Sequence, residues 1–303
     1  MNFAEQQRRN RQRTVLLIGA FVALFATVGA LLDLTVVGAP LPVATLTALL
    51  VAGATSVLGW RHGANWVLAS LLAEPLRDDD PEHRQLANIA SEMAIAAGLP
   101  RPRLFVIPDP SPNALAAGAG PTDAAIAVTA GALALLDREE TQGVVAHEMA
   151  HIANRDSALM TLVSVLFGGL LMLADWARRS LFFARQGNRA VNPLAVVLLP
   201  LLVLLTPLLS RLLAMAVSRR REYQADATAV ELTRNPEGLA RALEKIAGSE
   251  FPLRAATRGS AHLFIVSPLR HHADDADDSW ASLFATHPPL AQRVALLRGL
   301  AEH

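Results

Sequence analysis

The chain contains no cysteine. This absence excludes disulfide bonds, a cysteine nucleophile and thiolate metal ligands, so a bound metal must be held by histidine, aspartate or glutamate. Charged residues are also scarce, at 18% of the 303 residues, and the formal net charge is zero. A chain without excess positive charge gives no indication of a nucleic-acid partner.

Apolar residues, by contrast, are abundant. They make up 52% of the chain, which exceeds the usual share in a soluble domain, and the mean hydropathy is positive at +0.33. Most of the long apolar stretches fall into two pairs of segments, separated by sequence of soluble character. This uneven distribution predicts a membrane protein with a water-facing domain.

The first apolar pair covers residues 14–32 and 42–60, and neither segment contains a charged residue. Each is long enough to cross the hydrocarbon core of a bilayer, so we expect residues 1–60 to form a transmembrane hairpin. Four arginines precede the hairpin and Arg61 follows it, which places both of its ends in the cytoplasm. A cleaved signal peptide is the alternative, but its apolar region is usually shorter and is not followed at once by a second apolar segment.

The second apolar pair covers residues 158–174 and 193–209. Each segment is close to the minimum length for crossing a bilayer. Four arginines lie between them, and these would face the outside if both segments crossed, against the positive-inside rule. Full crossing and association with the membrane surface therefore both stay open.

The sequence of soluble character alternates between strand-like and helical patterns. Residues 103–107 and 124–131 are typical of short strands. Helices are expected wherever apolar residues recur at helical spacing, within residues 80–100, 138–154, 218–232, 236–248 and 286–300. The expected fold class is mainly α with a small β-sheet (α+β).

The stretch HEMAH places His147 and His151 four residues apart, with Glu148 between them. Residues at this spacing lie on one face of a helix, so both imidazoles can bind one metal ion. Zinc prefers nitrogen and oxygen ligands, and in a catalytic site it keeps a water whose pKa falls to about 7. Glu148 is then positioned to act as the general base. The alternative, two structural histidines on a core helix, would bury two polar groups on an apolar segment, each of which needs a partner.

A catalytic zinc site needs a third protein ligand. A third histidine six residues after the second is excluded, because Ser157 occupies that position. Among the glutamates between the second apolar pair and residue 251, only Glu222 has a carboxylate, Asp226, four residues on and on the same helix face. We therefore predict that Glu222 binds the metal, and that Asp226 hydrogen-bonds the outer ring nitrogen of a ligand histidine, His147.

Four motifs occur together in a fixed order: NALAAG at 113–118, HEMAHIANRD at 147–156, SRRREYQAD at 218–226 and THPP at 286–289. With an apolar pair between the second and third motifs, the chain resembles the HtpX family of membrane-bound zinc metalloproteases, which is related to the CAAX prenyl proteases. The resemblance covers almost the whole chain. One departure is Leu115, where relatives tend to have an aromatic residue.

The resemblance implies a gluzincin-type fold, one Zn²⁺ per chain, and cleavage of membrane or misfolded proteins in quality control and stress response. It also implies a multi-pass protein of the cell inner membrane whose catalytic domain faces the cytoplasm. Residues 61–157 and 217–303 would then form the metalloprotease domain, and residues 158–216 the hydrophobic helix pair between its two parts.

Further residues gain candidate roles. Asn113 and Ala114 match the family's edge strand beside the zinc, to which an extended substrate could add through backbone hydrogen bonds. His287 of the THPP motif is the candidate for steadying the oxyanion, because Tyr223, directly after Glu222 on a helix, points about 100° away from the metal. Two alternative functions stay open: a CAAX-type prenyl protease, whose members have more membrane segments, and a non-catalytic membrane adaptor that retains a zinc site.

Overall fold

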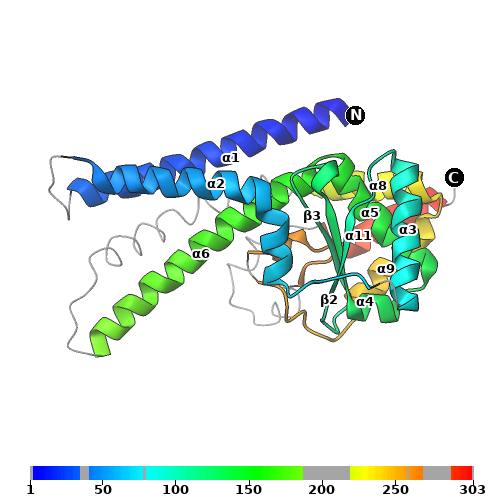
Figure 1. The fold of residues 1–303 in the computed structure, drawn as a ribbon. Helices are drawn as coiled ribbons and strands as arrows, with labels where there is room; N and C mark the ends of the chain where they lie inside the picture. Colours follow the sequence, from blue (N-terminus) through cyan, green and yellow to red (C-terminus); the bar gives the residue numbers. More distant parts are fainter. Residues whose placement is uncertain are drawn as a thin grey trace.

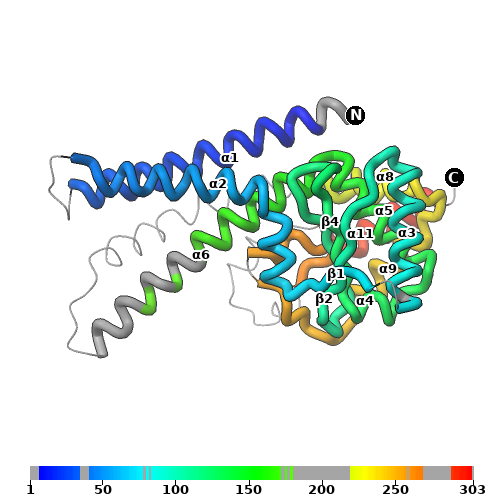
Figure 2. Tube along the Cα trace, in the orientation of Figure 1, coloured from blue at the N-terminus to red at the C-terminus, as the bar shows by residue number. Residues whose placement is uncertain are grey.

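Three long helices extend from one side of the molecule in the computed structural model (Figure 1). They are α1 (Phe3–Leu32), α2 (Val43–Ser70) and α6 (Asp156–Gln186). The sheet and the other helices gather around the inner end of this group, as the chain trace in Figure 2 also shows. The structure describes residues 3–34, 41–77, 80–186, 219–257, 259–268 and 288–301.

Helices α1 and α2 agree with the predicted hairpin. Within them, Gln7–Leu32 and Val43–Ser70 are long and apolar enough to cross a bilayer, with mean hydropathies of 2.6 and 1.7. Large apolar side chains on both helices are exposed, including Leu16, Leu46 and Leu50. Exposed apolar surface of this kind suits helices that face lipid rather than water.

The turn end of the hairpin is fixed by one carboxylate. Asp33 accepts hydrogen bonds from the backbone N–H groups of Ala44 and Thr45, both at 2.9 Å, and from the Thr45 hydroxyl at 2.6 Å. These bonds satisfy N–H groups at the start of α2 that have no partner within the helix. Gly29 allows close contact here, because a Cβ atom at this position would lie 2.5 Å from the Thr45 Cα atom.

The first segment of the second apolar pair, residues 158–174, lies within α6 and begins near its start. The other segment, residues 193–209, lies outside the described residues. Crossing of the bilayer by this pair stays a prediction.

A four-stranded sheet forms the centre of the water-facing part. Its strands are β1 (Glu74–Pro75), β2 (Arg103–Ile107), β3 (Ala114–Ala117) and β4 (Ala125–Thr129), in the spatial order β1-β2-β4-β3. The β2–β4 pair is parallel and the other two pairs are antiparallel. Strand β3 therefore lies at one edge of the sheet, with β4 on one side of it.

Helices cover one face of the sheet, and all of them except α4 have bounds close to the predicted ones. They are α3 (Pro81–Ala97), α4 (Ala130–Leu135), α5 (Arg138–Ala153), α8 (Arg219–Thr233), α9 (Pro236–Ala247) and α11 (Leu290–Ala301). A 3₁₀ turn, η2 (Pro121–Asp123), precedes β4, and another, η3 (Ala261–Leu263), lies against α6. The predicted fold class, mainly α with a small β-sheet, is confirmed.

The two faces of the sheet contact different parts of the molecule. Ala114 and Ala116 of β3 belong to a buried cluster with Met149 of α5. Leu115 points the other way, because successive side chains of a strand alternate between faces, and it packs in a second cluster with Met160 of α6. Strand β3 therefore packs against the motif helix α5 with one face and against α6 with the other.

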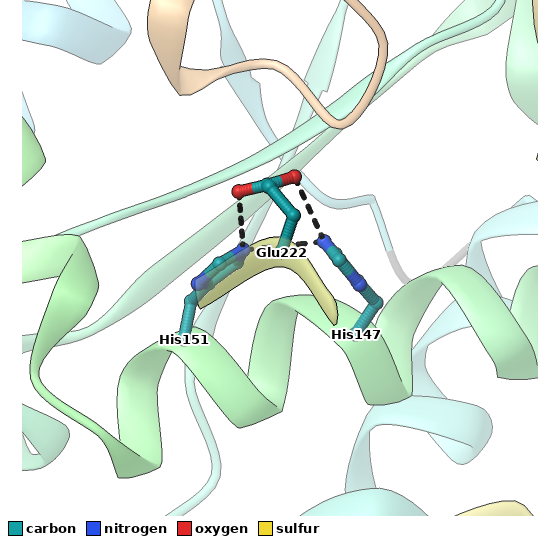
Figure 3. Close-up of side chains that lie close together, drawn as sticks. All are labelled: His147, His151 and Glu222. Carbon is teal, nitrogen blue, oxygen red and sulfur yellow. Dashed lines mark hydrogen bonds and ion pairs between the residues drawn. The ribbon is translucent and has the colours of Figure 1, made fainter. Parts of the chain in front are cut away.

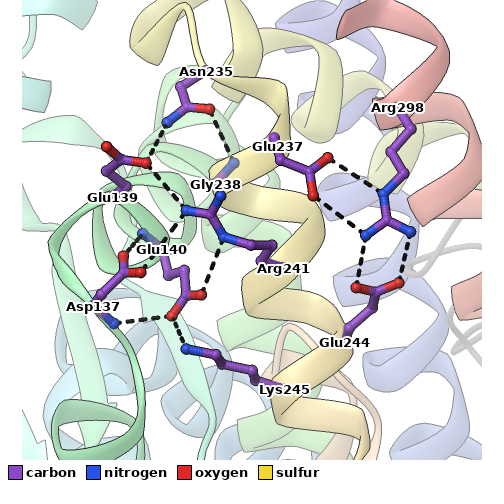
Figure 4. A network of polar contacts seen from close by, with 10 residues as sticks. All are labelled: Asp137, Glu139, Glu140, Asn235, Glu237, Gly238, Arg241, Glu244, Lys245 and Arg298. Carbon is purple, nitrogen blue, oxygen red and sulfur yellow. Dashed lines mark hydrogen bonds and ion pairs between the residues drawn. The ribbon is translucent and has the colours of Figure 1, made fainter.

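The start of α5 is held by a capping box. The Asp137 side chain accepts from the Glu140 N–H group, and the Glu140 side chain accepts from the Asp137 N–H group, both at 2.9 Å. Glu140 is buried and also accepts from Lys245 Nζ at 2.7 Å and from Arg241 Nε at 3.4 Å, both on α9 (Figure 4). This network fixes α5 against α9.

We expect Glu140→Ala to lower the free energy of unfolding by about 2 kcal/mol, because it removes the capping box and two charge-assisted hydrogen bonds. The matched control is Glu139→Ala. Glu139 is exposed and bonds Arg241 and Asn235 at the surface, so its loss should change stability by less than about 0.5 kcal/mol. Thermal unfolding of the detergent-solubilised chain measures both, and equal shifts would contradict the assignment.

Candidate metal centre

Helix α5 brings the two motif histidines together in the interior. The side chains of His147 and His151 are buried, and their Nε2 atoms lie 3.2 Å apart. The two rings meet edge to face, with 4.7 Å between their centroids. This is the arrangement expected of residues one helical turn apart that direct a nitrogen atom to the same point.

Glu222 of α8 approaches the same point from above the helix (Figure 3). Its Oε1 atom lies 3.6 Å from His151 Nε2, and its Oε2 atom lies 4.0 Å from His147 Nε2. Ligand atoms of tetrahedral zinc, at bond lengths of about 2.0–2.1 Å, are separated by about 3.3 Å. The His147, His151 and Glu222 atoms, all within 4.8 Å of one another, fit such an ion with small shifts.

A buried pair lies behind His147. This pair consists of Asp226 and Arg293. The Nδ1 atom of His147 is 2.9 Å from Asp226 Oδ1. Arg293 of α11 donates to both oxygens of Asp226, from Nε at 2.8 Å and from Nη2 at 2.7 Å. Burial acts to raise the pKa of Asp226, but the charge and hydrogen bonds of Arg293 outweigh it and hold the pKa below its usual range. Asp226 is therefore ionised and fixes the orientation of the His147 ring.

A second carboxylate lies behind His151. Asp156, the first residue of α6, places Oδ2 3.3 Å from His151 Nδ1. Its other oxygen accepts from Asn10 Nδ2 at 2.7 Å and from Arg221 Nη1 at 3.3 Å. Each histidine thus has its own outer carboxylate, an arrangement that fixes the tautomer and orientation of metal-binding imidazoles.

The charges around the two histidines suit a cation site. Burial lowers the pKa of His147 to about 4, against the opposing effect of Asp226, so this imidazole is neutral as a metal ligand must be. Burial also acts to lower the pKa of His151, but the carboxylates of Asp156 and Glu222 outweigh it and raise the pKa to about 9. The same carboxylates favour a cation at this position.

Glu148 lies beside the three possible ligands without joining them. Burial raises its pKa to about 7, and the charge of His151 opposes this effect. Its Oε1 atom is buried and has no hydrogen-bond partner among the described residues. The backbone N–H group of Ala116 in β3 contacts the same carboxyl group. The site therefore combines three side chains that could hold a metal ion with an available acid–base group.

Other sequence-based candidates bond to residues outside this group or lie outside the described residues. Ala114, the first residue of β3, and Asn113, directly before it, are buried, and their polar groups contact residues after η3. The Tyr223 hydroxyl donates to Gln292 Oε1 at 3.0 Å, on α11. His287 lies outside the described residues.

The sequence reasoning did not identify Asp156, Arg293 or Asn10 as part of this centre. Asp156 ends the HEMAHIANRD motif, so its position in that motif was an available signal. Arg293, in the otherwise uncharged stretch PPLAQRVALL, offered a weaker signal, because a charge on an apolar helix face needs a buried partner. Nothing in the local sequence distinguishes Asn10 from its polar neighbours.

A family model described as "Peptidase family M48" matches residues 80–301. This chain belongs to peptidase family M48. Proteins named "Protease HtpX homolog" match it over nearly its full length: that of Lactobacillus acidophilus is 38% identical over 97% of this chain and 98% of its own. The Lactiplantibacillus plantarum protein is 40% identical over 98% and 99%.

A third relative of the same name, from Dictyoglomus turgidum, is 43% identical over 76% of this chain and 72% of its own. Among solved structures, a crystal structure of S. mikatae Ste24p covers 97% of this chain and 67% of that protein, at 19% identity and a TM-score of 0.47. The family match and the relatives confirm the predicted resemblance and the predicted activity of a membrane metalloprotease.

Proposed function

We propose that this M48 metalloprotease holds one Zn²⁺ through His147, His151 and Glu222, and that it uses Glu148 as general base. The observation that carries the proposal is the convergence of three ligand atoms beside a buried carboxyl group with a free oxygen. A bound zinc ion supplies Lewis acidity, which lowers the pKa of its water to about 7. The experiment is zinc quantification together with proteolysis assays of the purified chain.

In this proposal the protein's own groups move the protons. Glu148 accepts a proton from the attacking water at Oε1 and later gives it to the leaving amine. Its pKa of about 7 suits both transfers, because a general acid–base group works best near the working pH. His287 is the proposed group that steadies the oxyanion.

Substrates are membrane or unfolded proteins bound as extended chains. The edge of β3 at Asn113 and Ala114 is the proposed binding strand, because backbone groups of an edge strand can pair with any extended peptide. Its position beside Glu148, which the Ala116 N–H group contacts, supports this assignment. Cleavage of a panel of membrane and unfolded proteins tests the substrate class.

We expect the catalytic part to face the cytoplasm, because four arginines precede the first membrane segment. A reporter fused after His303 measures the orientation, and labelling only from outside the cell would reverse it. If the C-terminus lies inside, the same reporter at Gln186 decides whether the second apolar pair crosses the inner membrane.

Asp226→Asn is expected to weaken zinc binding by about 10–100-fold, because an amide orients the His147 ring less strongly than a carboxylate. Added zinc should restore occupancy. Chelator competition measures the dissociation constant, and thermal unfolding checks that the chain still folds when Arg293 loses the Asp226 charge and keeps only its ion pair with Glu222, at 3.6 Å. A zinc affinity equal to that of the wild type in a folded variant would contradict this role.

A further inference from the structure

The edge of β3 that faces away from β4 is paired with another segment of the same chain. Phe264 lies opposite Leu115 in an antiparallel bridge. The next residue, Ile265, donates its backbone N–H group to the Ala114 carbonyl oxygen at 2.9 Å. This edge is the one that β4 leaves open, so residues 264–266 extend the sheet beyond β3.

Side chains of the proposed site complete the pairing. Asn113 Nδ2 donates to the Val266 carbonyl oxygen at 2.9 Å, and Asn113 Oδ1 lies 3.4 Å from the Val266 N atom. Arg293 Nη1 donates to the Ile265 carbonyl oxygen at 2.9 Å. Arg293 is the residue that also holds Asp226 behind the metal ligand His147.

The paired edge is also the one that faces the general base. Backbone groups of alternate strand residues point to the same side, so Ala114 and Ala116 share an edge. Ala116 contacts Glu148, while Ala114 is paired with Ile265. A peptide lying antiparallel along this edge beside Glu148 would need the positions that Ile265 and Val266 hold.

We propose that residues 264–266 form a pseudosubstrate strand, which occupies the binding edge and leaves it when a substrate enters. The proposal rests on the proposed function of Asn113 and Ala114. The occupant is apolar and buried, with Phe264 at 0% and Ile265 at 2% exposure. Competing substrates are therefore extended apolar segments, of the kind that unfolded and membrane proteins expose.

The strand has an anchor from which it can open. His262 in η3, directly before the strand, lies 3.2 Å through Nε2 from both the Met160 carbonyl oxygen and Ser164 Oγ on α6. These contacts hold the start of the strand on a long helix rather than on β3. Release of residues 264–266 from β3 therefore leaves the anchor on α6 in place.

A reversible disulfide tests the proposal. The chain has no cysteine, so Leu115→Cys with Phe264→Cys introduces one pair, at positions that lie opposite each other in the bridge. We expect oxidation to reduce cleavage of unfolded casein by at least about tenfold, and a phosphine reductant to restore it, with zinc content unchanged. The wild type and both single-cysteine variants, treated alike, are the controls. Full activity of the oxidised double variant would overturn the proposal.

Another variant, Ile265→Pro, tests the proposal if the double-cysteine variant does not fold. Ile265→Pro removes the N–H donor to Ala114 and should raise the rate of casein cleavage at least about threefold. An unchanged or lower rate in the folded variant would overturn the pseudosubstrate strand. Adding Glu148→Gln separates the two proposals. If cleavage persists after Glu148→Gln is added, the catalytic assignment is wrong. If the oxidised double-cysteine variant is active and Glu148→Gln abolishes this activity, only the pseudosubstrate strand is wrong.

A second, independent observation concerns the first membrane helix. Asn10 of α1 is buried and donates to the Asn154 carbonyl oxygen at 3.0 Å and to Asp156 Oδ1 at 2.7 Å. Gln7 Nε2, one turn earlier, donates to the Ala153 carbonyl oxygen at 2.9 Å. The start of α1 is therefore docked on the end of the motif helix α5.

This contact reaches the metal centre through one side chain. Asp156 bonds Asn10 with one oxygen and approaches His151 Nδ1 with the other, at 3.3 Å. We infer that Asn10 is a positioning residue, through which the membrane helix holds Asp156 and hence the His151 ring. Docking of α1 then contributes to metal affinity and not only to anchoring.

Chelator competition on the full chain in detergent tests this role. Asn10→Ala should weaken zinc binding on the order of tenfold, the lower end of effects seen for outer partners of metal ligands. Thr14→Val is the control, because Thr14 is buried on the same helix and donates only to the Asn10 carbonyl oxygen. In an Asp156→Asn background, Asn10→Ala should have no further effect. A zinc affinity of Asn10→Ala equal to that of the wild type would overturn the inference. So would a further loss of affinity when Asn10→Ala is added to Asp156→Asn.

Discussion

Replacement of Glu148 by glutamine is expected to reduce proteolysis by about 10²–10⁴-fold while zinc stays bound, because an amide cannot accept the proton of the attacking water. Glutamine has nearly the same shape as glutamate, and Glu148 is 1% exposed, so the fold should be unchanged. Autolysis during purification should stop as well. Zinc content and cleavage of unfolded casein measure the two parts of the result.

The matched control lies on the same helix. Glu139→Gln changes a glutamate of α5 that is exposed and bonds only Arg241 and Asn235 at the surface, so its activity should equal that of the wild type. The assignment of the general base fails if Glu148→Gln retains substantial activity. Loss of zinc together with activity would instead indicate that Glu148 helps to hold the metal.

Glu222→Ala is expected to lose most of its zinc at modest metal concentration, because only the two nitrogen ligands of α5 remain. Two imidazoles cannot complete the three-ligand site that catalytic zinc requires. The removed carboxylate also supplies negative charge beside His151, at 3.6 Å from Nε2. Metal analysis after dialysis measures the stoichiometry, and activity should fall in parallel.

Glu231→Ala is the control for this variant. Glu231 lies on the same helix, α8, and is exposed. It should bind zinc like the wild type. If Glu231→Ala loses its zinc while Glu222→Ala retains it, the assignment of the third ligand is wrong. The helix register predicted from SRRREYQAD is then wrong as well.

The sequence by itself determined the local features of this protein. The uncharged lengths of residues 14–32 and 42–60 predicted α1 and α2, because crossing length is a property of a single segment. Spacing within one helix predicted that His147 and His151 share a face, and that Glu222 and Asp226 share another. Such local predictions are possible because a helix fixes the relative directions of its own residues.

The tertiary structure alone decided which distant residues complete the centre. Arg293 meets Asp226 across 67 residues, and Asn10 meets Asp156 across 146. Periodicity shows that a side chain faces inwards but does not show which partner it meets there. The pairing of Ile265 with Ala114 is of the same kind, because any extended segment can hydrogen-bond to an edge strand. The packing of η3 against α6 brings this segment to β3. Backbone hydrogen bonds carry no sequence information, so the sequence did not reveal this pairing.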